Sequence, residues 1–289
     1  MVEILNPRFA IFIKSEIWPN YINELKKRDI KFFLVNYVYE RYNSRIFKEI
    51  LKKYTKIFTQ DDNSERELKK MKVDNTLYIG NLKFNRAKLQ KKEKYINKKL
   101  INYLGDDKCI VFGSTWGRDE EIIFDYMNEE INKNMKYIIA PHEVSKKNIS
   151  RIKSKLNNKV NLLSDNKYNV QNNILIVDSI GVLKYLYKFS NISYIGGGFQ
   201  KKGLHNILEP CAYGNPVIFG KHFKFSNEAK ALIKLKGGFS IQNSKQLKNT
   251  INGLLLNANK LKEIEIINSK FIDDNLVSIN SITKSMQNE

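Results

Sequence analysis

The sequence predicts an α/β protein whose sheets are parallel. Short apolar runs rich in β-branched and aromatic residues alternate with longer segments of helical periodicity, which is the pattern of βαβ units. The length of 289 residues is enough for about two such domains. Runs that are apolar on both faces, such as 174–177, are typical of a parallel sheet covered by helices on two sides.

The amino-terminal segment contains four predicted strands, at 9–13, 31–36, 56–59 and 76–79, separated by helical patterns around 21–28, 44–53 and 64–71. Ser64 and Glu67 have the spacing of a capping box, so we expect a helix to begin near Ser64. Four strands are few for a doubly wound sheet, and the first of them starts close to Met1. The sequence therefore predicts a truncated first domain over residues 1–86.

The segment 87–104 is polar and rich in lysine, which predicts a connection between two domains. Seven predicted strands follow it, at 109–113, 137–140, 160–163, 174–178, 192–195, 216–219 and 239–241. We expect them to form a complete doubly wound domain over 105–265, followed by a helical tail at 266–289. In such sheets ligands bind beyond the carboxyl ends of the strands, so the candidate site residues are those that follow strands.

The chain carries 50 Lys and Arg residues against 30 Asp and Glu residues, a formal net charge of +20. This charge favours nucleic acid, anionic membranes or phosphorylated small molecules as partners. Of the 50 basic residues 42 are Lys, spread singly and in pairs rather than in an arginine-rich block with interleaved aromatic residues. A compositional bias toward Lys accounts for this distribution, and we rank nucleic acid below the other partners.

The two cysteines, Cys109 and Cys211, form no CxxC pair, which predicts buried, reduced thiols in a cytoplasmic protein. No run reaches the roughly 18 consecutive apolar residues of a membrane-spanning helix. The first residues also lack the pattern of a secretory signal. The sequence thus predicts a chain that does not span a membrane.

The most informative segment is a predicted strand that runs directly into three glycines at 196–198. Consecutive glycines allow positive φ angles and a close approach of the backbone to a ligand, and a helix opening at His205 would add free amides for an anion. Glu209, in the first turn of that helix, is suited to accept hydrogen bonds from two ribose hydroxyls. Lys201, Lys202 and His205 would offset negative charge. The alternative is a glycine-rich turn with a solvated Glu209.

All three histidines, His142, His205 and His222, follow predicted strands. We interpret them as contacts for phosphate or carboxylate groups at the ligand-binding edge of one sheet. The chain offers no partner cysteines and no HxxxH spacing, so neither a metal nor another cofactor is predicted. The alternative for each histidine is a hydrogen-bonded structural residue.

Two charged residues of the first segment also follow predicted strands. Glu16 lies between the strand at 9–13 and Pro19, which is suited to the first turn of a helix, so its carboxylate is expected at the ligand-binding edge. Lys83 follows the strand at 76–79 and offers an ammonium group to an anion. The alternative is that Glu16 caps a helix and that Trp18 belongs to the core.

Taken together and in this order, the motifs of the chain resemble the Kdo transferases, the 3-deoxy-D-manno-octulosonic acid transferases of lipopolysaccharide assembly. The resemblance covers nearly the whole chain, and none of its motifs would be specific alone. It rests on the segments 15–20, 80–84, 113–115, 140–142, 177–181, 196–198, 205–210 and 214–217.

The resemblance implies a GT-B glycosyltransferase with two Rossmann-like domains. Such an enzyme moves Kdo from CMP-Kdo to a lipid A precursor of the lipid IV-A type, as a peripheral protein at the inner face of the cytoplasmic membrane of a Gram-negative bacterium. The implied reaction is inverting and independent of metal. The implied CMP contacts are Pro141, His142, Ile180, Gly181, Val182, Asn206, Ile207, Leu208 and Glu209. To these we add candidate phosphate or Kdo contacts at Ser114, Gly197, Gly198, Lys201 and His205.

Glu16 and Lys83 match positions that the resemblance implies assist the transition state, Lys83 by stabilising the charge around the departing phosphate and the anomeric carboxylate. His142 stands where the family usually carries Arg. The family's general base is a Glu near the start of its first domain, and no residue of this chain can be assigned that role. A positioned base typically supplies about 10²–10⁴-fold in rate.

Three hypotheses from different classes therefore stand. The first is a Kdo transferase that either works with a separately encoded amino-terminal piece or looks truncated because Met1 is not its true start. The second is a catalytically inactive remnant that binds CMP or CMP-Kdo. The third is a basic nucleic-acid-associated protein, which requires the positive charge to gather on one face. A truncated first domain also predicts an exposed sheet edge, and hence aggregation or a partner.

Overall fold

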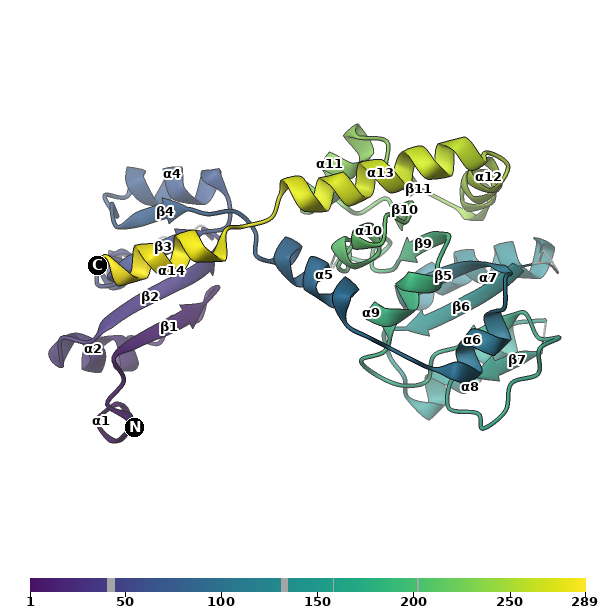
Figure 1. Ribbon diagram of the computed structural model, residues 1–289, viewed down its shortest axis with the longest axis horizontal. Coiled ribbons are helices and arrows are strands. Elements are labelled where there is room, and N and C mark those ends of the chain that lie inside the picture. The colour runs from purple at the N-terminus through teal and green to yellow at the C-terminus, as the bar shows by residue number, and fades with distance from the viewer. Residues whose placement is uncertain (41–44, 131–134, 158, 202) are drawn as a thin grey trace. The chain divides into compact units, whose positions relative to one another are not determined.

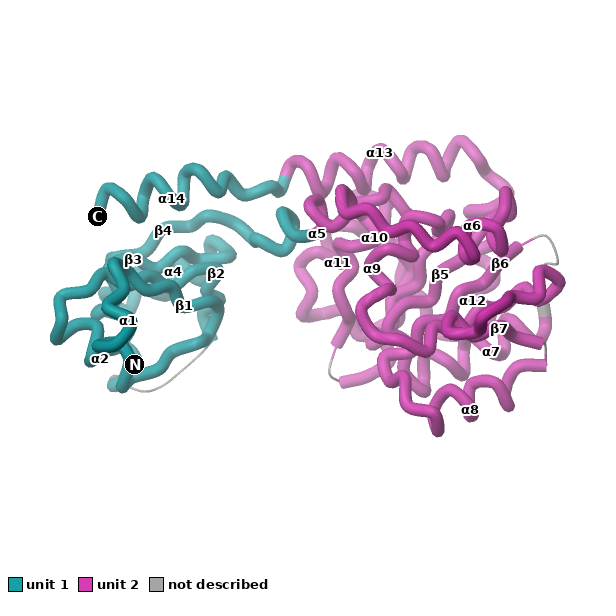
Figure 2. Tube along the Cα trace, turned by 60° about the horizontal axis from the view of Figure 1, so that its bottom comes forward, with its two compact units in different colours: residues 1–86, 275–289 teal, residues 87–274 magenta. Residues whose placement is uncertain are grey.

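The computed structural model describes residues 1–40, 45–130, 135–157, 159–201 and 203–289. The chain divides into two compact units, one formed by 1–86 together with 275–289 and the other by 87–274 (Figure 2). The predicted connection at 87–104 lies within the larger unit, and the predicted tail at 266–289 is divided between the two. Each unit is built on one parallel sheet (Figure 1).

The smaller unit contains a four-stranded parallel sheet in the order β1-β2-β3-β4. Each strand starts at its predicted residue and ends within one residue of the prediction: β1 (Phe9–Ile13), β2 (Lys31–Tyr37), β3 (Lys56–Thr59) and β4 (Thr76–Tyr78). The helices of this unit are α1 (Val2–Leu5), α2 (Pro19–Lys27), α3 (Arg45–Leu51), α4 (Asp62–Lys70) and, from the carboxyl end of the chain, α14 (Ile279–Gln287).

The two faces of the smaller sheet are covered by different parts of the chain. Residues such as Phe32 and Leu34 pack against α2, α3 and α4 on one face. On the other face Phe33 packs with Val277 and with Ile282 of α14. β1 is an edge strand, and its residues Phe9, Ile11 and Ile13 lie on the α14 face but remain 53%, 48% and 57% exposed. This exposed sheet edge with its apolar side chains is the feature that the sequence predicted for the first segment.

The helix predicted to begin near Ser64 begins earlier, at Asp62. Its N-cap is Asp61, whose Oδ1 accepts the amide of Ser64 at 2.7 Å. Ser64 is buried, and its hydroxyl accepts the amide of Tyr39 at 2.8 Å. The helix predicted near Ser64 is therefore confirmed, but the capping box is wrong, because an aspartate three residues upstream supplies the acceptor.

The larger unit contains a seven-stranded parallel sheet in the order β11-β10-β9-β5-β6-β8-β7. Its strands are β5 (Lys108–Thr115), β6 (Met135–Pro141), β7 (Val160–Leu162), β8 (Ile174–Ile176), β9 (Ile192–Ile195), β10 (Val217–Gly220) and β11 (Gly238–Ile241). The helices are α5 (Lys83–Lys92), which begins in the smaller unit and crosses into the larger one after Arg86, α6 (Lys98–Leu104), α7 (Gly117–Glu130), α8 (Lys146–Lys155), α9 (Leu183–Leu186), α10 (Leu208–Ala212), α11 (Asn227–Lys234), α12 (Ser244–Leu255) and α13 (Ala258–Asp274).

Both faces of the larger sheet are buried. Ile110 and Ile139 on one face pack in a core with residues of α7, α8 and α12. Val111 and Ile138, which alternate with them along the strands, are also fully buried. This explains why strands such as β8 read as continuous apolar runs.

The strand order of the larger sheet reverses at β5. The chain leaves β5 toward β6, β8 and β7, and later returns to the other side of β5 with β9, β10 and β11. The carboxyl end of β5 is therefore a topological switch point, the place where open parallel sheets bind ligands.

Candidate functional site

The residues that follow β5, β6 and β9 meet at this switch point. The amide of His142 donates to Thr115 O at 2.9 Å, and the amide of Gly196 donates to Gly113 O at 2.8 Å. Ser114 lies between these contacts, where β5 and β6 shift in register, and has a left-handed φ of 53°. A serine in this conformation is uncommon, because the left-handed region is unfavourable for residues with a Cβ. The end of β5 is thus held in a special conformation next to the glycine segment.

The glycines at 196–198 serve the packing of the protein's own backbone. A Cβ on Gly196 would lie 2.1 Å from Ser114 O, and one on Gly198 would lie 2.5 Å from the amide nitrogen of Gly220. Gly197 has a φ of 91°, and a Cβ on it would lie 2.4 Å from Gly203 O. The sequence interpretation attributed these glycines to close approach of a ligand; the structure gives each a steric reason within the fold.

Asp119 ties the glycine segment to the start of α7. Its Oδ2 accepts the amides of Gly197 at 2.9 Å and of Trp116 at 3.0 Å, and its Oδ1 accepts the hydroxyl of Tyr194 at 2.7 Å. Asp119 is fully buried. Burial raises the pKa of this carboxyl above its usual value. The three hydrogen bonds that the carboxylate accepts lower the pKa, but burial has the larger effect.

Trp116, His142 and His205 form a cluster of three rings, here called the ring cluster. The indole Nε1 of Trp116 donates to Nε2 of His205 at 2.7 Å. His142 stacks on Trp116 with ring centroids 4.2 Å apart and lies 4.7 Å from the ring of His205. Burial, and secondly the neighbouring His142, lower the pKa of His205 below its usual value. Two of the three predicted histidines therefore meet, and a tryptophan joins them.

A second buried carboxylate supports the end of β5. Glu120 is 1% exposed and accepts the hydroxyl of Thr115 at 3.1 Å through Oε1. Its Oε2 pairs with Arg151 of α8, which also donates to Asn148 Oδ1. A buried charge that is paired and hydrogen-bonded in this way holds its neighbours in place.

The helix predicted to open at His205 begins three residues later, as α10 at Leu208. The side-chain Nδ2 of Asn206 donates to Oε1 of Glu209 at 3.1 Å, and its Oδ1 accepts the main-chain amide of Leu208 at 3.2 Å. The side chains of Ile207 and Leu208 are buried, so these two residues can offer a ligand only their main chain. Asn206 and Glu209 thus form a hydrogen-bonded pair, and Asn206 directly follows His205 of the ring cluster in the sequence.

The remaining predicted residues of the larger unit lie around the same edge. Pro141 is the buried last residue of β6. Ile180, Gly181 and Val182 follow β8, two strands from β5, with Ile180 85% exposed and Gly181 at a φ of 88°. Lys201 is exposed in the turn after the glycines.

The third histidine, His222, follows β10, which is the neighbour of β9 in the sheet. His222 is exposed, and its amide donates to Gly198 O at 2.7 Å. Lys202 lies outside the described residues. The structure thus anchors the backbone of His222 to the glycine segment and leaves its imidazole at the surface.

The two charged residues of the smaller unit follow opposite edge strands of its sheet. Glu16 is exposed after β1 and accepts the indole N–H of Trp18 at 2.9 Å. Residues 14–18 line a hollow of about 310 Å³ there. Trp18 is 55% exposed and is itself the N-cap of α2, with Pro19 in the first turn as expected. The alternative that Glu16 caps this helix and Trp18 is core is therefore wrong.

Lys83 starts α5 after a loop that returns toward β2. The amide of Leu82 donates to the side-chain oxygen of the buried Asn36, at the end of β2, at 3.2 Å. Four strands spaced by about 4.8 Å would separate β1 and β4 by about 14 Å. The contact between Leu82 and Asn36 brings the start of α5 back to the strand next to β1.

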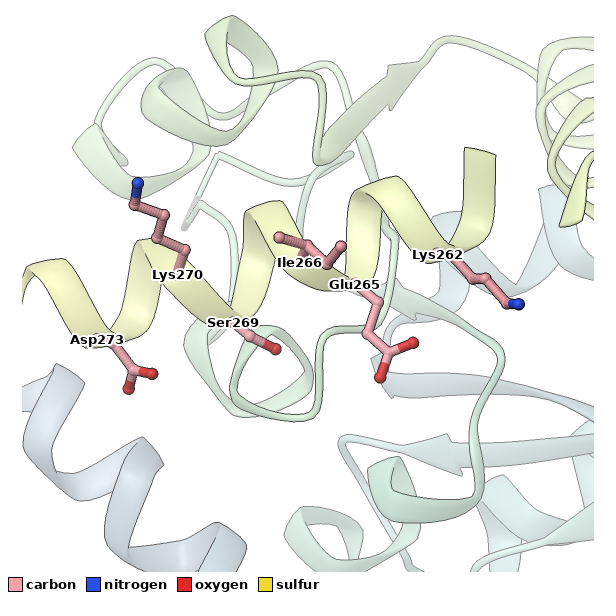
Figure 3. Close-up of a pocket in the computed structure, with 6 residues that line it drawn as sticks. All are labelled: Lys262, Glu265, Ile266, Ser269, Lys270 and Asp273. Atoms are coloured by element: carbon pink, nitrogen blue, oxygen red, sulfur yellow. The ribbon is translucent and has the colours of Figure 1, made fainter. Parts of the chain in front are cut away.

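A larger hollow, of about 560 Å³, runs along α13 (Figure 3). It is lined by Lys262, Glu265, Ile266, Ser269, Lys270 and Asp273, and Asp273 already pairs with Lys88 at 2.6 Å. None of these residues follows a sheet strand. The hollow combines opposite charges on a single helix and gathers no group suited to catalysis.

The part of the chain that the structure describes contains no group of three His, Cys, Asp or Glu residues placed to hold a metal ion. Over the same residues, no helix has the length and apolar character needed to cross a bilayer. Cys109 and Cys211 are buried free thiols, as expected.

The sequence reasoning missed Trp116, Asp119 and Tyr194. One signal was present, because Asp119 occupies the third position of α7 and reaches back to the amide before the helix, which is half of a capping box. The contacts to Gly197 and His205 carry no local signal, since they join residues 78 and 89 positions apart.

Solved structures support the fold of both units. The C-terminal CMP-Kdo binding domain of WaaA from Acinetobacter baumannii matches 66% of this chain and 98% of its own length, with a TM-score of 0.56 and 20% identity. A UDP-GlcNAc 2-epimerase from Neisseria meningitidis matches 100% of this chain and 78% of its own length, with a TM-score of 0.69 and 12% identity. At these identities the likeness concerns the fold, which is that of the GT-B proteins.

Sequence comparison gives the family. The family model for 3-deoxy-D-manno-octulosonic-acid transferase matches residues 1–86. A 3-deoxy-D-manno-octulosonic acid transferase of Rickettsia bellii is 32% identical over 93% of this chain and 67% of its own length.

Two other relatives are longer than the matched region. The enzyme of the same description from Rickettsia prowazekii is 34% identical over 93% of this chain, and a bifunctional glycosyltransferase/methyltransferase from Fusobacterium nucleatum is 33% identical over 98% of it. The chain spans 61% and 46% of the lengths of these two proteins. With both units matched in order across nearly all of its residues, the chain belongs to the 3-deoxy-D-manno-octulosonic acid transferase family.

Proposed function

We propose that the chain takes part in the transfer of Kdo from CMP-Kdo to a lipid A precursor of the lipid IV-A type in lipopolysaccharide biosynthesis. The observation that carries the proposal is the meeting of Ser114, His142, Gly197 and His205 at the switch point of the larger sheet, in a chain of this family. Basic and hydrogen-bonding groups at such an edge suit a phosphate and a carboxylate, the two anionic groups of CMP-Kdo.

The donor nucleotide would lie along the carboxyl ends of β8, β6, β5 and β9. Asn206 and Glu209, which are hydrogen-bonded to each other, would bind the ribose hydroxyls, and Ile207 and Leu208 would contribute main-chain groups. Pro141 and the loop 180–182 would contact the rest of the nucleotide. The exposed loop carrying Ile180 gives this side of the site an apolar surface for the base.

The anionic groups would be bound from the β5 and β9 side. His142, His205 and Lys201 would supply donors there, Ser114, which lies against Gly196, would add a hydroxyl, and Gly197 and Gly198 would add main-chain groups. His142 is exposed and already oriented by Trp116. An imidazole in place of a guanidinium offers one donor rather than a fork, so the phosphate contact at this position would be weaker.

In the smaller unit Glu16 and Lys83 would assist the transition state. Lys83 is exposed at the first turn of α5 and is free to reach an anion, and its ammonium would stabilise the charge that develops as the phosphate leaves. The reaction would be inverting and would need no metal. A general base for the acceptor hydroxyl is assigned to none of the 289 residues, and we propose that polypeptide outside them supplies it.

The edge of β1 would be the place where that polypeptide binds. An extra parallel strand could pair with the main chain of β1, and its following helix could cover Phe9, Ile11 and Ile13, which are about half exposed. The relatives from Rickettsia prowazekii and Fusobacterium nucleatum contain polypeptide well beyond the matched region. The proposed occupant is therefore a βα segment with an apolar face.

The net charge of +20 supports a peripheral position on an anionic membrane, where the lipid acceptor resides. We propose the inner face of the cytoplasmic membrane as this location. A second candidate function for the 289 residues alone is binding of CMP or CMP-Kdo without turnover, since we assign the general base to none of them.

The test is transfer of labelled Kdo from CMP-Kdo to a lipid A precursor, with the chain alone and with the additional polypeptide that the longer relatives carry. Lys83→Ala and Glu16→Gln should each lower turnover by about 10²-fold or more if they act on the transition state. Lys92→Ala, at the other end of α5, is the matched control for charge. Turnover that is equal in Lys83→Ala and Lys92→Ala would contradict the role of Lys83, and loss of activity with EDTA would contradict a metal-independent reaction.

A further inference from the structure

Trp116 and His205 have nearly parallel rings that are joined by a hydrogen bond. Their rings are 13° from parallel with centroids 6.1 Å apart, and the indole Nε1 is 2.7 Å from the imidazole Nε2. His142 covers this pair from one side, at 4.2 Å from the tryptophan ring and 4.7 Å from the histidine ring. The three side chains come from segments that follow three different strands, β5, β6 and β9.

The direction of the hydrogen bond determines where His205 carries its proton. An indole nitrogen can only donate, so Nε2 of His205 must accept and must be unprotonated. A neutral imidazole then holds its proton on Nδ1. This leaves the Nδ1–H group as the donor that His205 can offer to a ligand.

The surroundings of His205 also disfavour its charged form. The ring packs against Gly197, whose Cβ position is 3.1 Å from Cδ2 of His205. The titratable groups near it are His142, within the ring cluster, and Asp119, which accepts the amide of Gly197. Burial and His142 lower the pKa of His205, and protonation of Nε2 would also place two donors against each other.

We propose that Trp116 is a positioning residue that holds His205 as the neutral Nδ1–H tautomer, and that this Nδ1–H group donates to an anionic oxygen of the sugar nucleotide. The second half of this inference rests on the proposed function. The first half concerns the free protein and stands by itself. A fixed tautomer removes the need to reorganise the imidazole when the ligand arrives.

The test uses ¹⁵N NMR of the three imidazoles in the full chain without ligand, assigned with His142→Gln and His222→Gln. In the unmodified chain we expect Nε2 of His205 to show the shift of an unprotonated nitrogen and Nδ1 that of a protonated one. Trp116→Phe keeps an aromatic ring against His142 but removes the donor. It should yield a mixture of tautomers for His205 and raise the pKa of His205 toward its usual value.

The same variants are then titrated with CMP. Loss of one hydrogen bond predicts an affinity about threefold to tenfold lower in Trp116→Phe. Trp18→Phe, which removes the other indole donor of the chain, should leave the His205 signals and the CMP affinity unchanged. A predominantly Nε2–H tautomer of His205 in the unmodified chain would overturn the positioning role without any variant. The expected tautomer together with no CMP binding would instead overturn the proposed function and leave the role of Trp116 standing.

Discussion

The carboxylate of Asp119 accepts the amide of Gly197 at 2.9 Å and so joins the first turn of α7 to the glycine segment after β9. The same carboxylate accepts the amide of Trp116, which starts the ring cluster. One buried side chain therefore sets the positions of two neighbouring parts of the candidate site. The effect of removing it is the first prediction.

Asp119→Asn should destabilise the larger unit by about 3 kcal/mol, because an amide has one acceptor oxygen where three buried donors need partners. Urea unfolding measures this loss. Asp125→Asn, an exposed position on the same helix, should change the free energy of unfolding by less than about 0.5 kcal/mol. Equal stabilities of the two variants would show that the Asp119 contacts do not hold the site together.

Gly196→Ala should also destabilise the fold, by about 3 kcal/mol, since the new methyl group would lie 2.1 Å from the main-chain oxygen of Ser114. Gly117→Ala is the control, because nothing lies within 4 Å of its Cβ position. Thermal unfolding of both variants decides the point. If Gly196→Ala unfolds at the temperature of the unmodified chain, the steric account of the glycine segment fails.

The lowered pKa of His205 predicts a pH dependence of stability. In the unfolded chain the imidazole takes up a proton as the pH falls below about 6.5, whereas the folded chain resists protonation until its lower pKa is reached. The contribution of His205 is therefore fully present above pH 6.5 and is lost as the pH falls through the folded pKa. Between pH 7.5 and 5.5 the unmodified chain should lose more stability than His205→Gln, and identical pH slopes would refute the prediction.

The apolar face of β1 predicts self-association of the isolated chain. Ile11→Lys places a charge in the middle of this edge, where Ile11 is 48% exposed and contributes little to the core. Sedimentation should show a smaller average mass for this variant, and no such change for Ile46→Lys on α3, where the side chain is 73% exposed. An unmodified chain that is monomeric at all concentrations would argue against an open edge at β1.

Most of the fold could be predicted because its strands are short runs of β-branched and aromatic residues that differ sharply from the helices around them. β1, β3 and β9 match their predicted residues, and β8 is shorter than predicted at its carboxyl end. Helix starts were less predictable. Ser64 and His205 both looked like helix starts, yet Asp61 and Ile207 are the N-caps. At the first helix the carboxylate of Asp61 supplies the acceptor, whereas Ile207 makes no side-chain cap hydrogen bond.

The candidate site could be predicted where a residue directly follows a strand, as His142 follows β6, or belongs to the glycine-rich segment after a strand, as His205 does after β9. Trp116 and Asp119 were missed because their partners lie 75 or more positions away, and only the sheet order brings them together. The glycines at 196–198 were found, but their main reason is contact with Ser114, Gly203 and Gly220, which no local pattern shows.

The most direct test of the account is calorimetric titration of the purified chain with CMP, with UMP and GMP as controls. The account predicts saturable binding of one CMP per chain that is weakened in His205→Ala and in Glu209→Ala, and weaker binding of the control nucleotides. Saturable CMP binding that survives both substitutions unchanged would place the nucleotide elsewhere. The absence of any CMP binding by a chain whose unfolding is cooperative would contradict the proposed donor site itself.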